Sequence, residues 1–136
     1  TWATEFGKLS ESKPILITSF RPIEHGLSGG ITMIGILGSL LGSSIIGLAT
    51  YLLIDSELIL IFGIIFTGFL AALFDSLIGD KLQGKYETES GKIIENMQVG
   101  ANLVSGYKII NNNFVNLLAT ITGPFLMYLT IYFMNQ

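Results

Sequence analysis

The 136-residue sequence lacks cysteine altogether and is poor in charge. Without cysteine, the chain has no disulfide framework, no thiol nucleophile and no thiolate metal site. Aspartate, glutamate, lysine and arginine together make up 12% of the residues, whereas roughly 25% is usual in soluble globular domains. So few charges do not cover a water-facing surface, and the composition therefore predicts an integral membrane protein.

Several familiar functional patterns are missing as well. Histidine occurs once, and there is no HExxH zinc motif and no Ser-His-Asp arrangement. The seven lysines and arginines form no patch interleaved with aromatic residues, so the sequence does not favour nucleic-acid binding. The opening letters TWATEFG do not resemble a signal peptide. They leave open a fragment of a larger bundle with helices upstream, or a homo-oligomer.

Hydrophobic residues make up 50% of the chain and gather in three long segments. A bilayer core is about 30 Å thick and is crossed by roughly 20 apolar helical residues. Residues 31–54 and 114–134 are uncharged, and residues 57–79 carry charge only near their ends. We predict an all-α fold, a polytopic membrane bundle with these three spans and a bend at Gly123-Pro124. A soluble protein with buried helices would need more polar surface.

All the cationic residues fall in two segments, 1–30 and 80–113. Three alternating spans place these segments on the same side of the membrane, and lysine and arginine mark the cytoplasmic side. We therefore predict a single integral membrane domain over residues 1–136 in the cell membrane, with both segments as cytoplasmic loops. A site between these loops would receive a water-soluble ligand from the cytosol and a lipid from the bilayer.

Local structure outside the spans is less strongly patterned. Residues 1–9 are interpreted as the end of a helix, and residues 10–30 as a loop interrupted by two prolines. Residues 80–98 are predicted to form an amphipathic surface helix. Residues 99–113 are expected to be irregular or weakly extended.

The glycine-rich stretch GLSGG, residues 26–30, directly precedes the first span. Glycines let successive backbone N–H groups turn inward around an anion, and the start of a helix adds partial positive charge. Lys13, Arg21 and His25 are near in sequence and would add full charges. The stretch therefore predicts a phosphate cradle, although it lacks the Gly-Lys-Ser/Thr ending of a P-loop. The alternative is a flexible hinge, with Arg21 bound to lipid headgroups.

Asp75 is an ionisable residue in the last turn of the second predicted span. Such residues usually face protein or water. We expect Asp75 to face a neighbouring helix, because it shares a helix face with small residues that permit close packing. The alternative is a position at headgroup depth. Carboxylates are the natural ligands of Mg²⁺, so we predict a metal site formed by Asp75, Glu5 and Asp80. The shared face consists of Gly68, Ala72, Asp75 and Gly79.

Asparagines lead into the third span. Asn112 or Asn113 is a suitable N-cap. Asn116 lies one turn into the span, where its amide needs a polar partner. Asparagine side chains bind ribose, base edges or phosphate through water, so ligand binding and a structural role both stay open for Asn116.

Nearly the whole chain resembles the transmembrane protein 19-like family of integral membrane proteins, which includes the plant phytyl phosphate kinase. More distantly, the first two of its motifs are similar to the acid–glycine–Lys–Gly pattern of CTP-dependent polyprenol kinases such as dolichol kinase. Four segments carry the resemblance, in the family's order: TWATEFGKLS (1–10), KPILITSFRPIEHGLSGGIT (13–32), FDSLIGDKLQGKY (74–86) and NNNFVNLL (111–118).

The resemblance implies transfer of a phosphoryl group from a nucleoside triphosphate, expected to be CTP, to an isoprenoid monophosphate, with Mg²⁺ as cofactor. By position, Asp75, Glu5 and Lys13 are the expected catalytic residues. Leu27 and Ser28 depart from the family pattern, which has threonine and asparagine there. The expected nucleotide- and phosphate-binding residues are Lys13, Arg21, His25, Gly26, Ser28, Gly29, Gly30, Ser76, Gln83, Asn113 and Asn116.

Two other functions stay open on the sequence. One is a non-catalytic membrane transporter or assembly subunit, although transporters usually show repeats and charges at the membrane midplane. The other is a cytidylyltransferase that forms a CDP-lipid, which would also use CTP and Mg²⁺. Such an enzyme releases pyrophosphate, whereas a kinase releases CDP.

Overall fold

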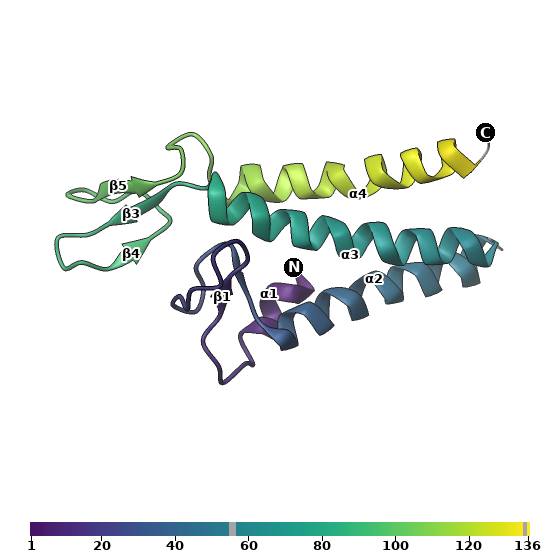
Figure 1. Cartoon of the computed structure of the whole chain (residues 1–136), viewed down its shortest axis with the longest axis horizontal. Coiled ribbons are helices and arrows are strands. Elements are labelled where there is room, and N and C mark those ends of the chain that lie inside the picture. The colour runs from purple at the N-terminus through teal and green to yellow at the C-terminus, as the bar shows by residue number, and fades with distance from the viewer. Residues whose placement is uncertain (55–56, 135) are drawn as a thin grey trace.

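The computed structural model describes residues 1–54, 57–134 and 136, and three long helices dominate it (Figure 1). These helices are α2 (Met33–Ile54), α3 (Leu58–Lys81) and α4 (Asn112–Met134). All three are long and apolar enough to cross a membrane, and many of their large apolar side chains are exposed. The three predicted spans are confirmed to within two residues at each end. Residues 55 and 56, which separate the first two predicted spans, lie outside the described residues.

A short helix, α1 (Trp2–Gly7), lies antiparallel along the beginning of α2. Glycines of α2 permit this close approach. A Cβ atom on Gly38 would stand 2.7 Å from Cβ of Phe6, and one on Gly42 would stand 3.2 Å from Cγ of Trp2. The predicted helix at the start of the chain is therefore confirmed, and it packs where α2 has no side chains to exclude it.

Small residues also set the packing of the long helices, as is usual between helices in membranes. The side chain of Ile65 of α3 packs against Gly47 of α2, and Gly68 of α3 packs against Ser43 of α2. Helix α3 packs in turn against α4, where Gly63 approaches Met127. Helix α4 continues as one helix through Pro124. The bundle therefore places α3 between α2 and α4 (Figure 1).

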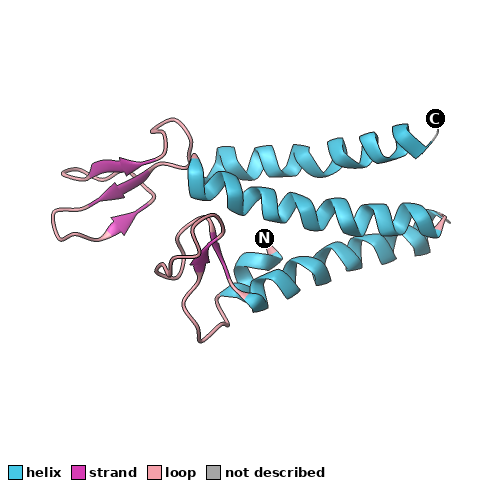
Figure 2. Ribbon diagram, in the orientation of Figure 1, coloured by secondary structure: helices cyan, strands magenta, loops and turns pink. Residues whose placement is uncertain are grey.

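The polar segments 8–32 and 82–111 lie at one end of the bundle, which we call the loop end (Figure 2). In the first segment, β1 (Ile15–Leu16) pairs antiparallel with β2 (Gly30–Ile31). The expected loop over residues 10–30 is thus largely correct, but it is closed by a short ladder. This ladder brings the glycine stretch back beside the start of the segment.

The second polar segment forms a three-stranded antiparallel sheet in the order β4-β3-β5. Its strands are β3 (Lys85–Glu87), β4 (Ile93–Ile94) and β5 (Asn102–Ser105). The predicted surface helix over residues 80–98 is therefore wrong. Helix α3 ends at Lys81, and a turn with Gly91 at φ +77° folds the following chain into a hairpin. The expectation of weakly extended chain over 99–113 agrees with β5.

Candidate functional site

A cavity of about 540 Å³ opens at the loop end, between the start of α2, the end of α3 and the beginning of α4. Helix α1 and the glycine stretch 26–30 complete its walls. Its lining is rich in polar groups. The charged or ionisable side chains in the lining are Lys8, His25, Asp75 and Glu95, and the asparagines are Asn96, Asn111, Asn112, Asn113 and Asn116.

Asp75 and Ser76 reach this cavity from α3. The helix face that Asp75 shares with Gly68 and Gly79 is covered by protein, because Gly68 lies against Ser43 and Gly79 lies against Ser28. The small residues on this helix face therefore predicted the direction of Asp75 correctly. Among the described residues, no group donates a hydrogen bond to Oδ1 of Asp75, although that oxygen is buried. A buried carboxylate oxygen without a donor is costly, and this makes Asp75 the best-placed residue in the lining to bind a cation.

The glycine stretch 26–30 also borders the cavity and rests on the end of α3. Gly29 has φ +85°, and a Cβ atom there would stand 2.5 Å from Cα of Asp80, so only glycine fits. The stretch does not lead directly into a helix, because β2 comes between them. Helix α2 is instead capped by Thr32, whose hydroxyl accepts the N–H of Gly35 at 3.0 Å. The glycine stretch and the first turn of α2 nevertheless line the same cavity.

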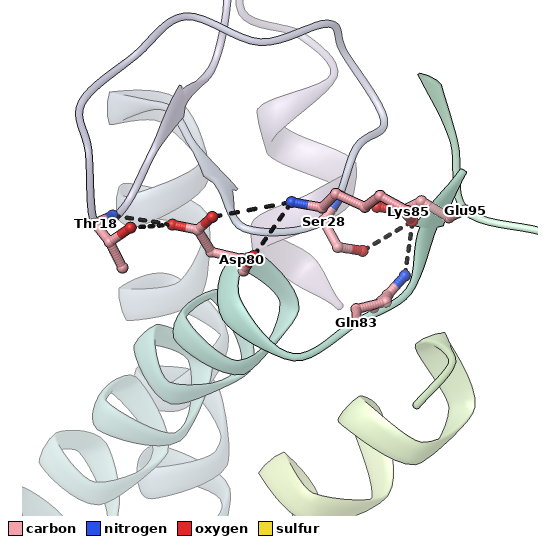
Figure 3. Close-up of polar contacts among 6 residues, drawn as sticks. All are labelled: Thr18, Ser28, Asp80, Gln83, Lys85 and Glu95. Carbon is pink, nitrogen blue, oxygen red and sulfur yellow. Dashed lines mark hydrogen bonds and ion pairs between the residues drawn. The ribbon is translucent and has the colours of Figure 1, made fainter. Parts of the chain in front are cut away.

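Glu95, which the sequence did not single out, holds the glycine stretch from the other side (Figure 3). Ser28 donates its backbone N–H to Oε1 of Glu95, and its hydroxyl to Oε2 at 2.9 Å. Gln83 donates from Nε2 to the same Oε2 at 2.9 Å. Gln83 is fully buried and is not part of the cavity lining. The structure thus places Gln83 behind Glu95 and outside the cavity lining, although the family resemblance implies that it binds nucleotide.

The three carboxylates predicted to bind metal do not meet. Asp80 accepts the backbone N–H and the hydroxyl of Thr18 at 3.2 and 2.5 Å. Glu5 pairs with Lys8 at 2.7 Å, and this hydrogen-bonded ammonium holds the pKa of Glu5 below its ordinary value. Within residues 1–54, 57–134 and 136, no group of three or more His, Asp or Glu side chains is placed to hold a metal. Of the predicted set, Asp75 lines the cavity.

The basic side chains near the cavity are also not all the ones that the sequence predicted. Lys13 and Arg21 are exposed and lie outside the cavity lining. Lys8 and His25 belong to the lining. Helical spacing would have indicated Lys8, because it shares a face of the first helix with Thr4 and Thr1, which also line the cavity.

Asparagines at the start of α4 close the remaining side of the cavity. The side chain of Asn111 accepts the N–H of Phe114 at 3.0 Å, so Asn111 is the N-cap. The prediction of Asn112 or Asn113 as the cap is therefore wrong, because α4 begins earlier than expected. Asn113 and Asn116 line the cavity, and their predicted role in ligand binding stays a prediction.

Comparisons with known proteins agree with this architecture. A family model described as "Integral membrane protein DUF92" matches residues 1–124. "Protein PGR" of Arabidopsis thaliana is 30% identical over 139 aligned positions, which cover 93% of this chain and 48% of the relative. "Uncharacterized membrane protein MJ0933" of Methanocaldococcus jannaschii is 37% identical over 123 positions, covering 90% of this chain and 42% of the relative. The chain thus spans about half the length of these curated relatives. No solved structure matches it.

Proposed function

The chain belongs to the DUF92 family of integral membrane proteins, and on this premise we propose that it is an isoprenoid phosphate kinase. The terminal phosphoryl group of CTP, or of another nucleoside triphosphate, passes to an isoprenoid monophosphate. The products are a nucleoside diphosphate and a phytyl or other polyprenyl diphosphate. In this proposal the loop end faces the cytoplasm of the cell and the reaction takes place at the membrane surface.

The observation that carries the proposal is that the polar cavity adjoins an apolar groove. The groove, of about 500 Å³, lies between α3 and α4, and Ile17 of the N-terminal polar segment also lines it. Leu73 lines both the groove and the cavity. A substrate with an anionic head and a long apolar tail needs these two environments side by side, and volumes of this size are typical of small-molecule sites. The remaining groove residues are Leu70, Phe74, Leu77, Thr122, Phe125 and Leu126.

The cavity also offers what phosphoryl transfer needs, which is positioning and neutralisation of charge. Lys8 and His25 contribute cationic or hydrogen-bonding groups. The first turns of α2 and α4 add backbone N–H donors and the positive ends of two helix dipoles. The acceptor monophosphate is already largely ionised near neutral pH, so the protein does not have to supply a strong base.

Mg²⁺ is the cofactor that this proposal includes. The chemistry of the lining fits it, because Asp75 presents a buried carboxylate oxygen that accepts no hydrogen bond from the described part of the chain. Mg²⁺ is commonly held by one or two carboxylates together with substrate phosphates. Asp75 would hold the ion, which would supply neutralising charge to the phosphates. Glu5 and Asp80 are left out of this set because each has its own partner.

The test is an assay of the purified protein in lipid nanodiscs with CTP labelled in its γ-phosphate. Phytyl phosphate and geranylgeranyl phosphate serve as acceptors. We expect labelled lipid diphosphate and stoichiometric CDP, both dependent on Mg²⁺. Release of pyrophosphate would support a CDP-lipid-forming cytidylyltransferase instead. Binding of the lipid phosphate without turnover of any nucleotide would support a transporter or an assembly subunit.

A further inference from the structure

Glu95 is the second carboxylate in the cavity lining, and its contacts give it a role of its own. We propose that Glu95 is the positioning residue of the glycine stretch: it fixes Ser28, so that the rest of the stretch keeps its backbone turned toward the bound anion. The identity of that anion, a nucleoside triphosphate, rests on the function proposed above. The contact between Glu95 and Ser28 does not.

The glycine stretch needs such support because its own structure holds it weakly. Gly26 has φ +92°, and no described atom lies within 4 Å of the place where its Cβ would stand. At the beginning of the stretch, the N–H of Leu27 donates to the carbonyl of Glu24 over a long 3.4 Å. The end of the stretch is held more firmly, because the carbonyl of Gly29 accepts the N–H of Ile17 at 3.0 Å. Ordering glycine costs more conformational entropy than ordering any other residue. Residues 26–28 therefore depend on contacts from outside the stretch.

Glu95 is itself rigidly held, which a positioning residue must be. It directly follows β4, whose Ile94 pairs with Tyr86 of β3. Behind it stands Gln83, whose side chain is fully buried. Gln83 also forms a β-bridge with Tyr107, next to the end of β5. The three-stranded sheet thus serves to present one carboxylate to Ser28, 67 residues earlier in the chain.

The charge of Glu95 matters as well as its place. Its two oxygens accept three hydrogen bonds, one from Gln83 and two from Ser28. Bonds to an ionised acceptor are stronger than bonds between neutral groups. Glutamine at this position would turn one oxygen into an NH₂ group, which would oppose a donor of Ser28 or of Gln83. Glu95→Gln therefore weakens the hydrogen bonds that position Ser28, while the side chain keeps its size.

The first experiment measures CTP binding with Mg²⁺ by the full chain in nanodiscs. The matched control is Glu87→Gln, which removes the same charge from an exposed residue of β3 in the same sheet. We expect Glu95→Gln to raise the Kd for CTP about tenfold, the effect of losing a charge-assisted hydrogen bond, and Glu87→Gln to leave it unchanged. The KM for the lipid phosphate and the kcat at saturating CTP should change much less. An unchanged Kd would overturn the proposal, and so would tighter binding, which would make Glu95 a competitor for the donors of Ser28.

A second experiment separates this inference from the proposed function. Hydrogen–deuterium exchange of residues 24–32, without any nucleotide, should be faster in Glu95→Gln than in Glu87→Gln. Equal exchange would overturn the positioning role even if the protein is a kinase. If the unaltered protein binds no CTP, the proposed function fails. Faster exchange in Glu95→Gln would still establish that Glu95 positions the glycine stretch. Should Glu95→Gln not fold, Ser28→Ala decides: it removes one of the three bonds and should speed exchange to a smaller extent.

Discussion

Thr18 donates both its backbone N–H and its hydroxyl to Oδ2 of Asp80, at 3.2 and 2.5 Å. Thr18 belongs to the N-terminal polar segment and Asp80 to the end of α3, so this pair fastens the segment to the helix that carries Asp75. On the other side of the carboxylate, Nζ of Lys85 lies 3.9 Å from Oδ1, and both side chains are nearly buried. Asp80 therefore has a structural use where its sequence position alone suggests a metal ligand.

Asp80→Ala should accordingly destabilise the fold. The substitution removes two hydrogen bonds and leaves the buried ammonium of Lys85 without its carboxylate, a change that costs about 3 kcal/mol or more. We expect a clear fall in the thermal midpoint in nanodiscs, with no recovery of activity when Mg²⁺ is raised. If the midpoint were unchanged and activity returned at high Mg²⁺, Asp80 would be a metal ligand after all.

Asp75→Asn should have the opposite profile. Because Oδ1 of Asp75 is buried and accepts no hydrogen bond in the described structure, replacing the charge with a neutral amide should not lower the thermal midpoint. Turnover should fall by about 100-fold or more, as expected when an electrostatic stabiliser of the transition state is removed. The matched control is Glu57→Gln, an exposed acid at the opposite end of α3. Full activity of Asp75→Asn would refute its assignment.

Two glycines of the same stretch should respond differently to alanine. Gly26→Ala places a side chain in open space but at φ +92°, which costs about 1–2 kcal/mol of backbone strain. Gly29→Ala adds to such strain a collision with the backbone of Asp80, which cannot move without displacing α3. We expect Gly26→Ala to fold with a modestly lower thermal midpoint and Gly29→Ala to fail to accumulate as folded protein. Equal midpoints would contradict the close packing of Gly29 on α3.

The features that could be predicted from sequence are those that depend on local composition. The spans at 33–54, 58–81 and 112–134 follow from hydropathy, and the direction of Asp75 follows from the helical period. The family resemblance seen in the motifs is likewise confirmed, because the family model covers residues 1–124. Each of these signals is contained in a short window of sequence or in motifs preserved in order.

The features that were missed depend on contacts between distant segments. Glu95 meets Ser28 across 67 positions, and Asp80 meets Thr18 across 62, so neither partner could be inferred from its neighbours. The sheet at 85–105 has strands of two to four residues, too short to produce a recognisable alternation. The convergence of segments 8–32 and 82–111 at one end was predictable from the number of spans. Which side chains meet there was not.

Asn111 and Asn116 should separate capping from ligand binding. Asn111→Ala removes the side-chain acceptor for the N–H of Phe114 and should lower stability by about 1 kcal/mol, the usual cost of losing an N-cap. Asn116 lines the cavity, and Asn116→Ala should instead raise the KM for nucleotide while leaving the thermal midpoint unchanged. Measuring both quantities for both variants checks the assignment, which fails if Asn116→Ala is the less stable of the two.

The lysine and arginine side chains show the largest difference between the phosphate-binding residues expected from sequence and those that the structure places at the cavity. Lys8 belongs to the cavity lining, whereas Lys13 and Arg21 lie outside it. If the cavity binds the triphosphate, Lys8→Met should raise the KM for CTP about tenfold, since hydrogen bonds to charged groups contribute roughly 1.5–3 kcal/mol. Lys13→Met and Arg21→Met should change it much less.

Glu5→Gln completes this series, because it releases Lys8 from its ion pair without altering the lysine itself. The pair is exposed, so its loss should hardly change stability. The freed ammonium should bind CTP at least as tightly as before, and a catalytic role for Glu5, as the motif resemblance implies, would instead appear as a fall in kcat. A large effect of Lys13→Met with none from Lys8→Met would move the triphosphate out of the cavity and onto the outer surface of the N-terminal segment, where Lys13 is exposed.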